Sequence, residues 1–354
     1  MSKCRVAIIG MGKMGKIRYQ SLEQHGGFDI VAICDVNSAI AEAYPKATCY
    51  SKWQDILALE LDAVFVCTFN DVICEIVCAS LDRGFHVFSE KPPGRNVADV
   101  SRMMEANDRN PQCKVKFGFN HRLHYGVMEA KALIDSKRYG ELMWARGVYG
   151  KAGGQQFGSD WRANPSKAGG GILLDQGIHM LDLLLYFVGD FVEVKSMVEN
   201  AYWSDVRLED NAFALMRTET GKVAMMHSSA TQWKHKFSLE LFMKEGYIIV
   251  NGILSSTRSY GEESVTFAKK QFEDETRAVG KPREETIYFD RDDSWRLEIE
   301  EFYDVVTGKK TEYHGTLADS FRCMSLVYQI YDADPKGFWG EQSQHDNAQR
   351  HTGS

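Results

Sequence analysis

The sequence lacks the long apolar runs that mark secreted and membrane-spanning proteins. Its first aliphatic run, in MSKCRVAIIG, meets a glycine almost at once and is too short for the hydrophobic region of a signal peptide. No stretch approaches the length of a membrane span. We therefore expect a cytoplasmic protein without a membrane partner.

An excess of basic residues is also missing. The chain has 42 Lys and Arg against 49 Asp and Glu, which gives a net charge of −7 at pH 7. Nucleic acids and anionic membranes bind to basic surfaces, so this balance argues against both as general partners. A local basic pocket for a phosphate-bearing substrate remains compatible with it.

The eight cysteines include no C-x-x-C knuckle. Several lie in or beside aliphatic, strand-like runs, where a free thiol behaves as a small core residue. Cys74 and Cys78 share one face of a predicted helix, which leaves a metal site as an alternative, but no further ligands cluster near them. We predict reduced thiols, no disulfide and no bound metal.

Aliphatic runs alternate with amphipathic stretches over residues 1–120. The runs lie at 5–10, 29–35, 62–68, 86–92 and 114–119, and helix-like stretches at 13–25, 37–44, 71–83 and 96–109 separate them. Continuous aliphatic strands joined by helices are typical of a parallel sheet covered on both faces. This pattern predicts a doubly wound α/β domain of the Rossmann type.

Longer alternating runs follow after about residue 139. Those at 142–150, 192–202, 211–231 and 236–252 predict a mainly antiparallel sheet, with hairpin turns at Thr220-Gly221 and around Glu245-Gly246. A strong helix is expected over 171–188 and closing helices over 294–308 and 316–331. We expect an α+β domain over 121–334 for substrate binding and oligomerisation, and a polar flexible tail over 335–354.

The stretch AIIGMGKMGK, residues 7–16, has the context of a dinucleotide-binding loop. A strand precedes it, a helix follows it, and an acidic residue ends the second strand 20 positions after the last glycine. The first glycine permits the tight turn, the second lets the backbone approach a pyrophosphate, and the third lets helix and strand pack closely. The predicted cofactor residues here are Gly10, Gly12, Lys13, Met14, Gly15 and Asp35.

The acidic residue favours NAD over NADP. The Asp35 carboxylate can accept hydrogen bonds from both ribose hydroxyls but would repel a 2′-phosphate, and VNSAI at 36–40 has no Arg or Lys to bind one. The third strand ends in VFVCTFND, so Thr68, Phe69 and Asn70 are expected to border the same cofactor.

Two stretches carry candidate catalytic groups. FSEKPPG at 88–94 places Glu90 and Lys91 at the end of a strand, where the lysine would bind substrate and cofactor or remain a surface residue. In GGGILLDQGIHMLDLLLYFVG at 169–189, Asp175 and His179 are four apart, which puts them on one face of a helix. His179 suits a proton-transfer role with the carboxylate orienting it. The alternatives are half of a metal site and a buried pair without a catalytic role.

Two loops add substrate candidates. SDWRANPSKAGGG at 159–171 offers Arg162 for a phosphate or carboxylate and Trp161 for stacking on a ring. TQWKHKFSLE at 231–240 offers Trp233 and His235 for a substrate pocket, with a solvated strand end as the equal alternative.

These motifs in this order resemble the Gfo/Idh/MocA oxidoreductases. The resemblance rests on GMGKMG, EKPPG, GFNHR at 118–122, DWR at 160–162 and GGGILLDQGIHMLDL at 169–183, and it spans residues 4–332. It implies a catalytic group of Lys91, Asp175 and His179, with Asn120, Arg122, Trp161 and Arg162 approaching cofactor or substrate. It also implies an open-faced sheet that pairs subunits into a homodimer or homotetramer.

The segment TFNDVI at 68–73 departs from the family pattern, with Phe69 in place of proline and Ile73 in place of histidine. Our hypothesis is an NAD-dependent dehydrogenase acting on a ring-carbon secondary alcohol of a sugar, cyclitol or nucleotide sugar. The alternatives are a catalytically silent NAD-binding regulator, and an enzyme that keeps NAD bound and uses transient oxidation for elimination or hydrolysis.

Overall fold

The computed structural model describes residues 3–154, 158, 161–255 and 257–337. They form two compact units. The first comprises Met1–Asn120, Ser166–Gly169 and Asp293–Met324, and the second comprises His121–Pro165, Gly170–Asp292 and Ser325–Ser354. The chain therefore crosses between the units more often than the single boundary at residue 120 predicts. Most of the predicted tail lies outside the described residues.

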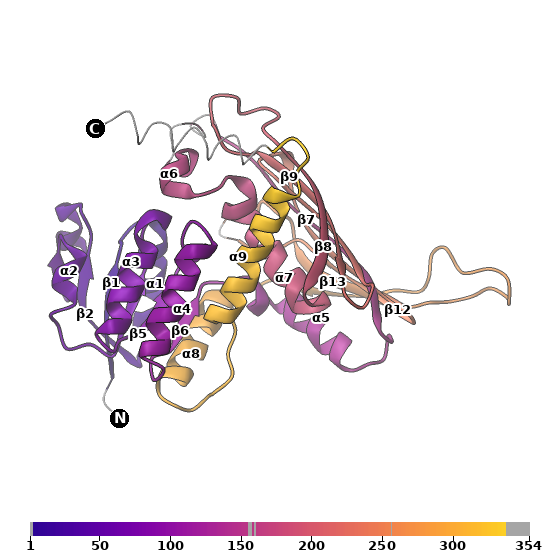
Figure 1. Ribbon diagram of the computed structural model, residues 1–354. Helices are drawn as coiled ribbons and strands as arrows, with labels where there is room; N and C mark the ends of the chain where they lie inside the picture. Colours follow the sequence, from indigo (N-terminus) through magenta and orange to yellow (C-terminus); the bar gives the residue numbers. More distant parts are fainter. Residues whose placement is uncertain (1–2, 155–157, 159–160, 256, 338–354) are drawn as a thin grey trace. The chain divides into compact units, whose positions relative to one another are not determined.

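The first unit is built on a parallel sheet of six strands in the order β3-β2-β1-β4-β5-β6 (Figure 1). Its strands are β1 (Cys4–Ile9), β2 (Phe28–Cys34), β3 (Thr48–Tyr50), β4 (Ala63–Val66), β5 (His86–Ser89) and β6 (Val115–Phe117). The strand order reverses direction at β1, between β2 and β4. In open α/β sheets, ligands bind outside the carboxyl ends of the strands at such a switch point.

Helices of the predicted lengths connect these strands. They are α1 (Lys13–His25), α3 (Asn70–Asp82) and α4 (Val97–Arg109), and a short helix that was not predicted, α2 (Trp53–Ile56), lies between β3 and β4. The helix expected over 37–44 is instead a 3₁₀-helix, Ser38–Ala43, capped by the Asn37 side chain. None of its residues is buried, so it has no apolar face that would stabilise a longer helix.

The second unit contains an eight-stranded sheet in the order β14-β13-β12-β11-β7-β10-β9-β8. Every neighbouring pair is antiparallel except β10 and β7, and both predicted hairpins, β9–β10 and β11–β12, are present. The strands are β7 (Leu142–Ala152), β8 (Phe191–Glu199), β9 (Asn211–Thr218), β10 (Val223–Ser229), β11 (Thr231–Met243), β12 (Gly246–Asn251), β13 (Glu263–Lys269) and β14 (Glu285–Phe289).

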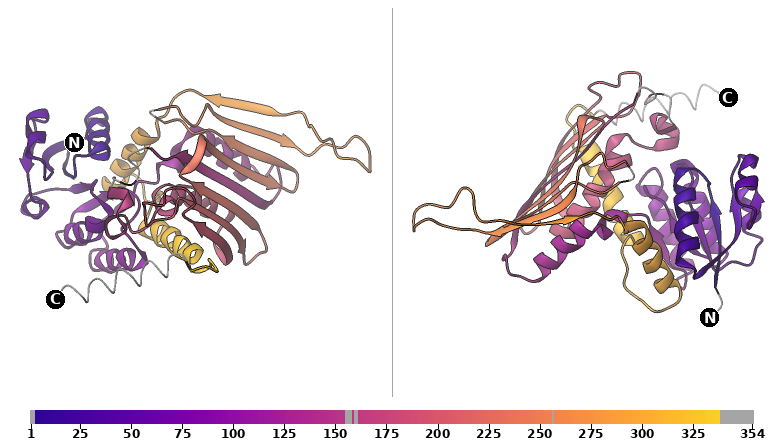
Figure 2. Two further views of the ribbon diagram at one scale, coloured as in Figure 1. Left: turned by 90° about the horizontal axis from the view of Figure 1, so that it is seen from above. Right: turned by 180° about the vertical axis from the view of Figure 1, so that it is seen from behind.

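Helices cover one face of this sheet. Figure 2 shows α5 (Tyr125–Asp135) and α7 (Ile178–Val188) along that face, and among the described residues no helix covers the other. The remaining helical segments are α6 (Pro165–Ala168), α9 (Leu317–Asp332), 3₁₀-turns at Asn120–Leu123 and Trp161–Ala163, and a π-helical turn at Leu173–Gly177.

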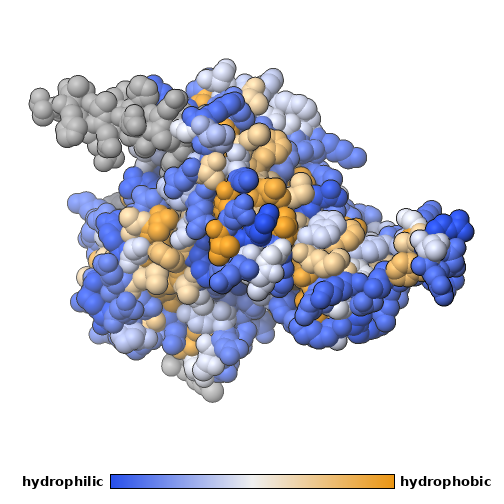
Figure 3. Space-filling view, turned by 45° about the vertical axis from the view of Figure 1, so that its right-hand side comes forward, coloured by the Kyte–Doolittle hydropathy of each residue, from blue (hydrophilic) through white to orange (hydrophobic). Residues whose placement is uncertain are grey.

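The uncovered face of the sheet carries apolar side chains. Met197, Phe213, Leu215 and Met225 are each more than two fifths exposed. Phe213 lies between Met197 of β8 and His227 of β10 in the strand register, and Leu215 pairs with Met225. Figure 3 shows, on the face that it presents, several apolar areas among polar residues.

One helical stretch, Pro165–Val188, is long and apolar enough by length and composition to cross a membrane, contrary to the prediction that no stretch approaches this length. Of its most apolar window, 83% is buried inside the protein. A helix that is apolar all round is expected in a protein core as well as in a membrane.

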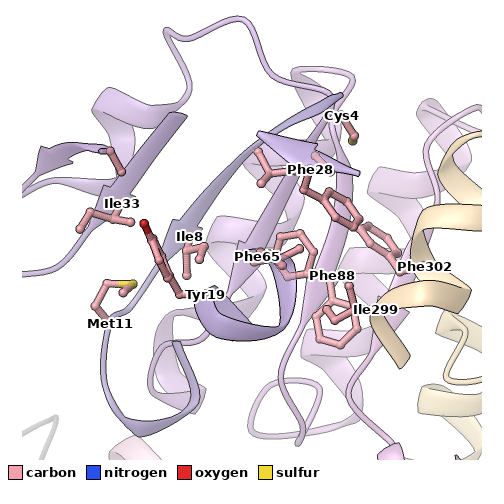
Figure 4. Packing of buried hydrophobic residues seen from close by; sticks show 14 residues of the cluster. Cys4, Ile8, Met11, Tyr19, Phe28, Ile33, Phe65, Phe88, Ile299 and Phe302 are labelled. Carbon is pink, nitrogen blue, oxygen red and sulfur yellow. The ribbon is translucent and has the colours of Figure 1, made fainter. Parts of the chain in front are cut away.

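The hydrophobic core of the first unit explains why the late segment Asp293–Met324 belongs to this unit. Phe302 of α8 (Ser294–Val306) packs edge-on against Phe65 of β4 and Phe88 of β5, at ring separations of 5.4 and 5.6 Å (Figure 4). Ile299, one turn earlier on α8, is fully buried in the same cluster. These contacts join residues more than 200 positions apart, so the domain boundary could not be read from local pattern.

Candidate active site

The glycine loop after β1 has the shape that a bound pyrophosphate needs. Gly10 has φ +90°, and a Cβ there would lie 2.5 Å from the Cys67 carbonyl oxygen, whereas a Cβ on Gly15 would lie 2.0 Å from the Gly10 carbonyl oxygen. Only glycine fits at these two positions. Gly12 has open space on its Cβ side. The loop therefore packs tightly at both ends and leaves its middle glycine accessible to a ligand.

Helix α1 begins directly at this loop. Gly12 is its N-cap, and within this fully described helix no side chain caps the N-terminus and no acidic residue occupies the first turn. The first backbone N–H groups and the positive end of the helix dipole therefore remain available for an anion. Lys13 is exposed and Met14 half-buried beside them.

Asp35 ends β2 next to the loop, as predicted. Its Oδ2 accepts a hydrogen bond from the Met11 N–H at 2.7 Å, and its Oδ1 accepts one from the Asn37 N–H at 2.9 Å. An ionised carboxylate has about four acceptor positions, so each oxygen can accept another bond. The geometry fits a ribose diol, with the carboxylate already oriented by the backbone.

Three other predicted cofactor residues have protein partners of their own. The buried Asn70 donates its side-chain amide to the Ala168 carbonyl at 2.7 Å, and the Asn120 amide donates to Ser294 Oγ at 3.0 Å. The Phe69 ring, 46% exposed, faces the Lys167 ammonium at 5.5 Å. Thr68 is half-buried. A role for these four in cofactor binding stays a prediction.

A buried arginine connects the nucleotide helix to the lysine motif. Arg18 of α1 is fully buried, with its Nε 2.6 Å from Glu90 Oε1 and its terminal nitrogen 2.7 Å from Glu298 Oε2. Burial acts to lower the pKa of Arg18, but the charges of the two carboxylates outweigh it and raise the pKa. Glu90 immediately precedes the half-buried Lys91. Sequence reasoning missed Arg18, although a charged residue between Ile17 and Tyr19 three positions after the glycine loop was the available signal.

In the second unit, Asp175 lies in the π-helical turn Leu173–Gly177 rather than in the predicted regular α-helix. The buried Glu209 side chain accepts hydrogen bonds from the N–H groups of Gly171 and Leu173, at 2.9 and 3.0 Å, which fixes the start of this segment. Single π-helical turns inside helices occur frequently at functional sites.

Two cations surround the Asp175 carboxylate. Lys151 Nζ lies 3.0 Å from Oδ2 and Arg162 Nε lies 3.3 Å from Oδ1. The guanidinium of Arg162 also lies over the Trp161 ring, 4.5 Å from its centroid. The structure thus brings together Asp175 and the predicted Trp161–Arg162 pair and adds Lys151, which sequence reasoning missed. Asp160 of the same motif lies outside the described residues.

His179, the first-turn histidine of α7, is buried and ordered by a second histidine. Its ring stacks on His121 with centroids 3.8 Å apart and planes 17° from parallel. His121 Nε2 lies 3.1 Å from the Tyr149 hydroxyl. Burial raises the pKa of Tyr149 well above its usual range, so this phenol stays protonated at neutral pH.

Tyr260 extends this group. Its ring packs 5.3 Å from that of Tyr149, and its hydroxyl donates to Gln176 Oε1 at 3.3 Å. Burial raises the pKa of Tyr260 to about 12. The predicted His235 joins here, since its ring contacts Tyr260 at 5.2 Å and its Nδ1 lies 2.9 Å from Ser259 Oγ. His121 lay within the GFNHR motif, but neither tyrosine had a local signal.

Arg122 and Trp233 lie in different surroundings. The buried Arg122 guanidinium makes two bonds to Asp182, at 2.8 and 2.6 Å, and packs over the Tyr186 ring, which holds α7 to the segment before α5. Trp233 is 60% exposed and packs edge-on against Tyr202. Binding of substrate by either residue stays a prediction.

All eight cysteines are free thiols, with Cys74 Sγ and Cys78 Sγ 4.0 Å apart on α3. In the described parts of the chain, no three His, Cys, Asp or Glu side chains are grouped in a way that would hold a metal ion.

Two family models match the chain. The model for the oxidoreductase family with an NAD-binding Rossmann fold matches residues 4–119, and the GFO/IDH/MocA C-terminal domain matches residues 127–249. The chain belongs to the Gfo/Idh/MocA oxidoreductase family. Its first unit is accordingly an NAD-binding domain, which agrees with the glycine loop, the uncapped helix and Asp35.

Relatives and solved structures of this family resemble the chain. It is 26% identical to myo-inositol 2-dehydrogenase of Thermotoga maritima over 72% of this chain and 77% of the relative. It is 31% identical to D-glucoside 3-dehydrogenase of Escherichia coli K12 over 57% of this chain and 58% of that protein. The structure of levoglucosan dehydrogenase in complex with NADH has the same fold, with a TM-score of 0.82, 21% identity, and coverage of 95% of this chain and 98% of that one.

Proposed function

We propose that this enzyme transfers a hydride between NAD and a ring-carbon secondary alcohol of a sugar, cyclitol or nucleotide sugar. NAD supplies the hydride acceptor, and the substrate hydroxyl loses its proton as the hydride leaves its carbon. Two observations on the second unit carry the proposal: Asp175 pairs with Lys151 and Arg162, and His179, four residues later in the chain, stacks on His121. The named activities of the relatives, an inositol 2-dehydrogenase and a glucoside 3-dehydrogenase, support this substrate class.

Each residue of the group has a chemical role in this proposal. His179 takes the hydroxyl proton, since a histidine titrates near neutral pH and the stacked His121 limits its ring orientation. Asp175, whose carboxylate pairs with Lys151 and Arg162, stabilises the positive charge that develops on the imidazole. Lys91 polarises the reacting oxygen. In the reverse direction the same groups return the proton.

The binding roles are assigned to the residues around these groups. Gly10, Gly12, Lys13, Met14 and Gly15 hold the pyrophosphate and Asp35 the ribose. Arg122 acts by positioning α7 through its bidentate pair with Asp182.

We place this enzyme in the cytoplasm as a homodimer or homotetramer. Support for the oligomeric state comes from the uncovered sheet face, where Met197, Phe213, Leu215 and Met225 form an exposed apolar strip. Contiguous apolar surface of this kind favours association. Light scattering on the Leu215→Asp variant should show a smaller particle than the parent protein, and an unchanged mass would contradict this assignment.

A substrate panel tests the central reaction. Free sugars, inositols and nucleotide sugars are incubated with the protein and NAD, and absorbance of reduced nicotinamide is followed. At least one should be oxidised, and Lys91→Met should lower turnover by about 10²–10⁴-fold while NADH fluorescence still reports binding. The exposed Lys46→Met variant is the matched control and should retain activity. NADH binding without turnover of any compound would favour a regulator instead.

A further inference from the structure

Three aromatic side chains, Tyr202, Trp203 and Trp233, form a cluster on the second unit that the reaction does not use. Tyr202 lies edge-on to Trp203 and to Trp233, with ring centroids 5.0 and 5.1 Å away, and the two tryptophan rings are 6.4 Å apart. Tyr202 and Trp233 are each 60% exposed. We refer to these three residues as the aromatic cluster.

Buried polar side chains fix the loop that displays the aromatic cluster. The Asp210 carboxylate, which is fully buried, accepts hydrogen bonds from the N–H groups of Ala201, Tyr202 and Trp203 at 2.8, 2.8 and 3.0 Å. The Asn200 amide donates to the Trp203 carbonyl at 3.1 Å, and to two further carbonyls of the loop. The loop is therefore rigid where it exposes its largest apolar side chains, which is typical of a preorganised ligand site.

The same loop is bonded to the segment that carries Asp175. Glu209, the neighbour of Asp210, accepts the hydrogen bonds from Gly171 and Leu173 that fix the start of the π-helical turn. Asp175 is two residues beyond Leu173.

The backbone at the end of β7 connects the aromatic cluster to the same site a second time. Trp203 Nε1 and the Gly153 N–H both donate to the Ala230 carbonyl, at 3.1 and 2.8 Å. A Cβ on Gly153 would lie 2.4 Å from the Trp203 ring, so the tryptophan packs directly on the backbone there. Gly153 is two residues beyond Lys151, whose ammonium binds Asp175. Two separate sets of contacts therefore connect the aromatic cluster to the segments that carry Asp175 and Lys151.

We propose that the aromatic cluster is a subsite for a second ring covalently attached to the sugar ring that reacts. This proposal rests on the proposed function for the identity of the reacting ring. Aromatic faces bind the apolar face of a sugar and the flat face of a nucleobase, so a glycoside and a nucleotide sugar share the chemistry that the subsite recognises. The preferred substrate is accordingly larger than a monosaccharide or an inositol.

Calorimetric titration with three probes tests this directly: methyl β-D-glucopyranoside with one ring, cellobiose with a second sugar, and UDP-glucose with a nucleobase. At least one two-ring probe should bind about tenfold or more tightly than the methyl glucoside. Tyr202→Ala should remove that preference without weakening the binding of the methyl glucoside, and Trp233→Ala should also remove the preference. Both side chains are 60% exposed, so these variants should fold. Tyr288 of the same unit is 67% exposed, so Tyr288→Ala is the matched control and should retain the preference.

The two probes with a second ring identify its source. A preference for cellobiose indicates a glycoside, and a preference for UDP-glucose indicates a nucleotide sugar. Equal binding of all three probes, or a preference that survives both variants, would overturn the subsite. A preference for two rings in a protein that turns over no compound in the substrate panel would support the subsite and contradict the proposed function. Turnover of a compound in the panel without a preference for two-ring probes would support the proposed function and contradict the subsite.

Discussion

Each unit of this protein contains a small group of opposite charges, and the two groups differ in their access to water. The buried cluster, Arg18 with Glu90 and Glu298, places one cation between two carboxylates, and all three side chains are less than a tenth exposed. The exposed cluster is Asp175 with Lys151 and Arg162. It places one carboxylate between two cations that are 28% and 46% exposed.

This difference in exposure to water gives the two clusters different functions. Charges without water depend on one another, so the buried cluster has a single stable arrangement and holds the residue before Lys91 in place. Charges that retain water exchange partners at little cost. Under the proposed function, we expect the exposed cluster to open and accept the hydroxyl groups of a substrate, while the buried cluster keeps Glu90, the residue before Lys91, bound to the nucleotide helix.

The largest expected effect comes from breaking the buried cluster. Arg18→Met leaves two buried carboxylates without their cation, and we expect a loss of about 3–5 kcal/mol in the free energy of unfolding. Urea denaturation measures it. A double variant, Arg18→Met with Glu298→Gln, should recover part of the loss because one uncompensated charge is removed. A loss below about 1 kcal/mol for the single variant would show that the buried cluster is no more important than a surface ion pair.

A third buried carboxylate, Glu209, belongs to neither cluster and should make the stability of the protein depend on pH. Burial raises the pKa of Glu209 to about 7, even though Tyr331 and backbone N–H groups bind it. A raised pKa means that the folded state favours the protonated carboxyl. The stabilisation that this carboxyl gives to the folded state is therefore complete below its pKa in the unfolded chain, near 4.5, and is lost as the pH rises to about 7.

Relative to Glu209→Gln, the parent protein should therefore lose up to about 3 kcal/mol of unfolding free energy between pH 4.5 and pH 8. Denaturation curves for both proteins across this range measure the difference. Parallel curves would indicate an unshifted carboxylate at this position.

The smallest expected effect on stability belongs to the exposed cluster. Lys151→Met should change the free energy of unfolding by less than about 1 kcal/mol, because the pair with Asp175 is partly solvated. It should lower kcat/KM by about 10–100-fold, since the lysine no longer orients the carboxylate beside the reacting site. Lys151→Arg should restore part of the activity. An equal loss of stability and activity would make Lys151 a structural residue.

The sequence pattern predicted those parts of the site whose residues lie close together in the chain. The strand, the glycine loop, helix α1 and Asp35 lie within 32 residues, and each is placed by its neighbours in the chain. The hairpins of the large sheet were predictable for the same reason. The departure from a regular helix at Asp175 was not predicted, and the side chain that binds the start of this segment, Glu209, lies 34 residues beyond Asp175 in the chain.

The substrate side of the site depends on sheet register and long-range packing. Lys151 reaches Asp175 only because β7 ends beside the π-helical turn, and His121 reaches His179 across 58 positions of sequence. Arg18 and Glu90 are likewise 72 positions apart. A single sequence gives no measure of such distances, so it offered catalytic candidates, which stay predictions, but missed Arg18, Lys151 and the contact of His121 with His179.

The most direct test of this account is to separate cofactor binding from chemistry at His179. NADH affinity by fluorescence and turnover of the substrate from the panel are measured together for the parent protein and His179→Gln. We predict unchanged NADH affinity, because the glycine loop and Asp35 lie in the other unit, with turnover lower by about 10²–10⁴-fold. Turnover within about twofold of the parent protein would contradict the assignment of His179 as the proton-transfer residue.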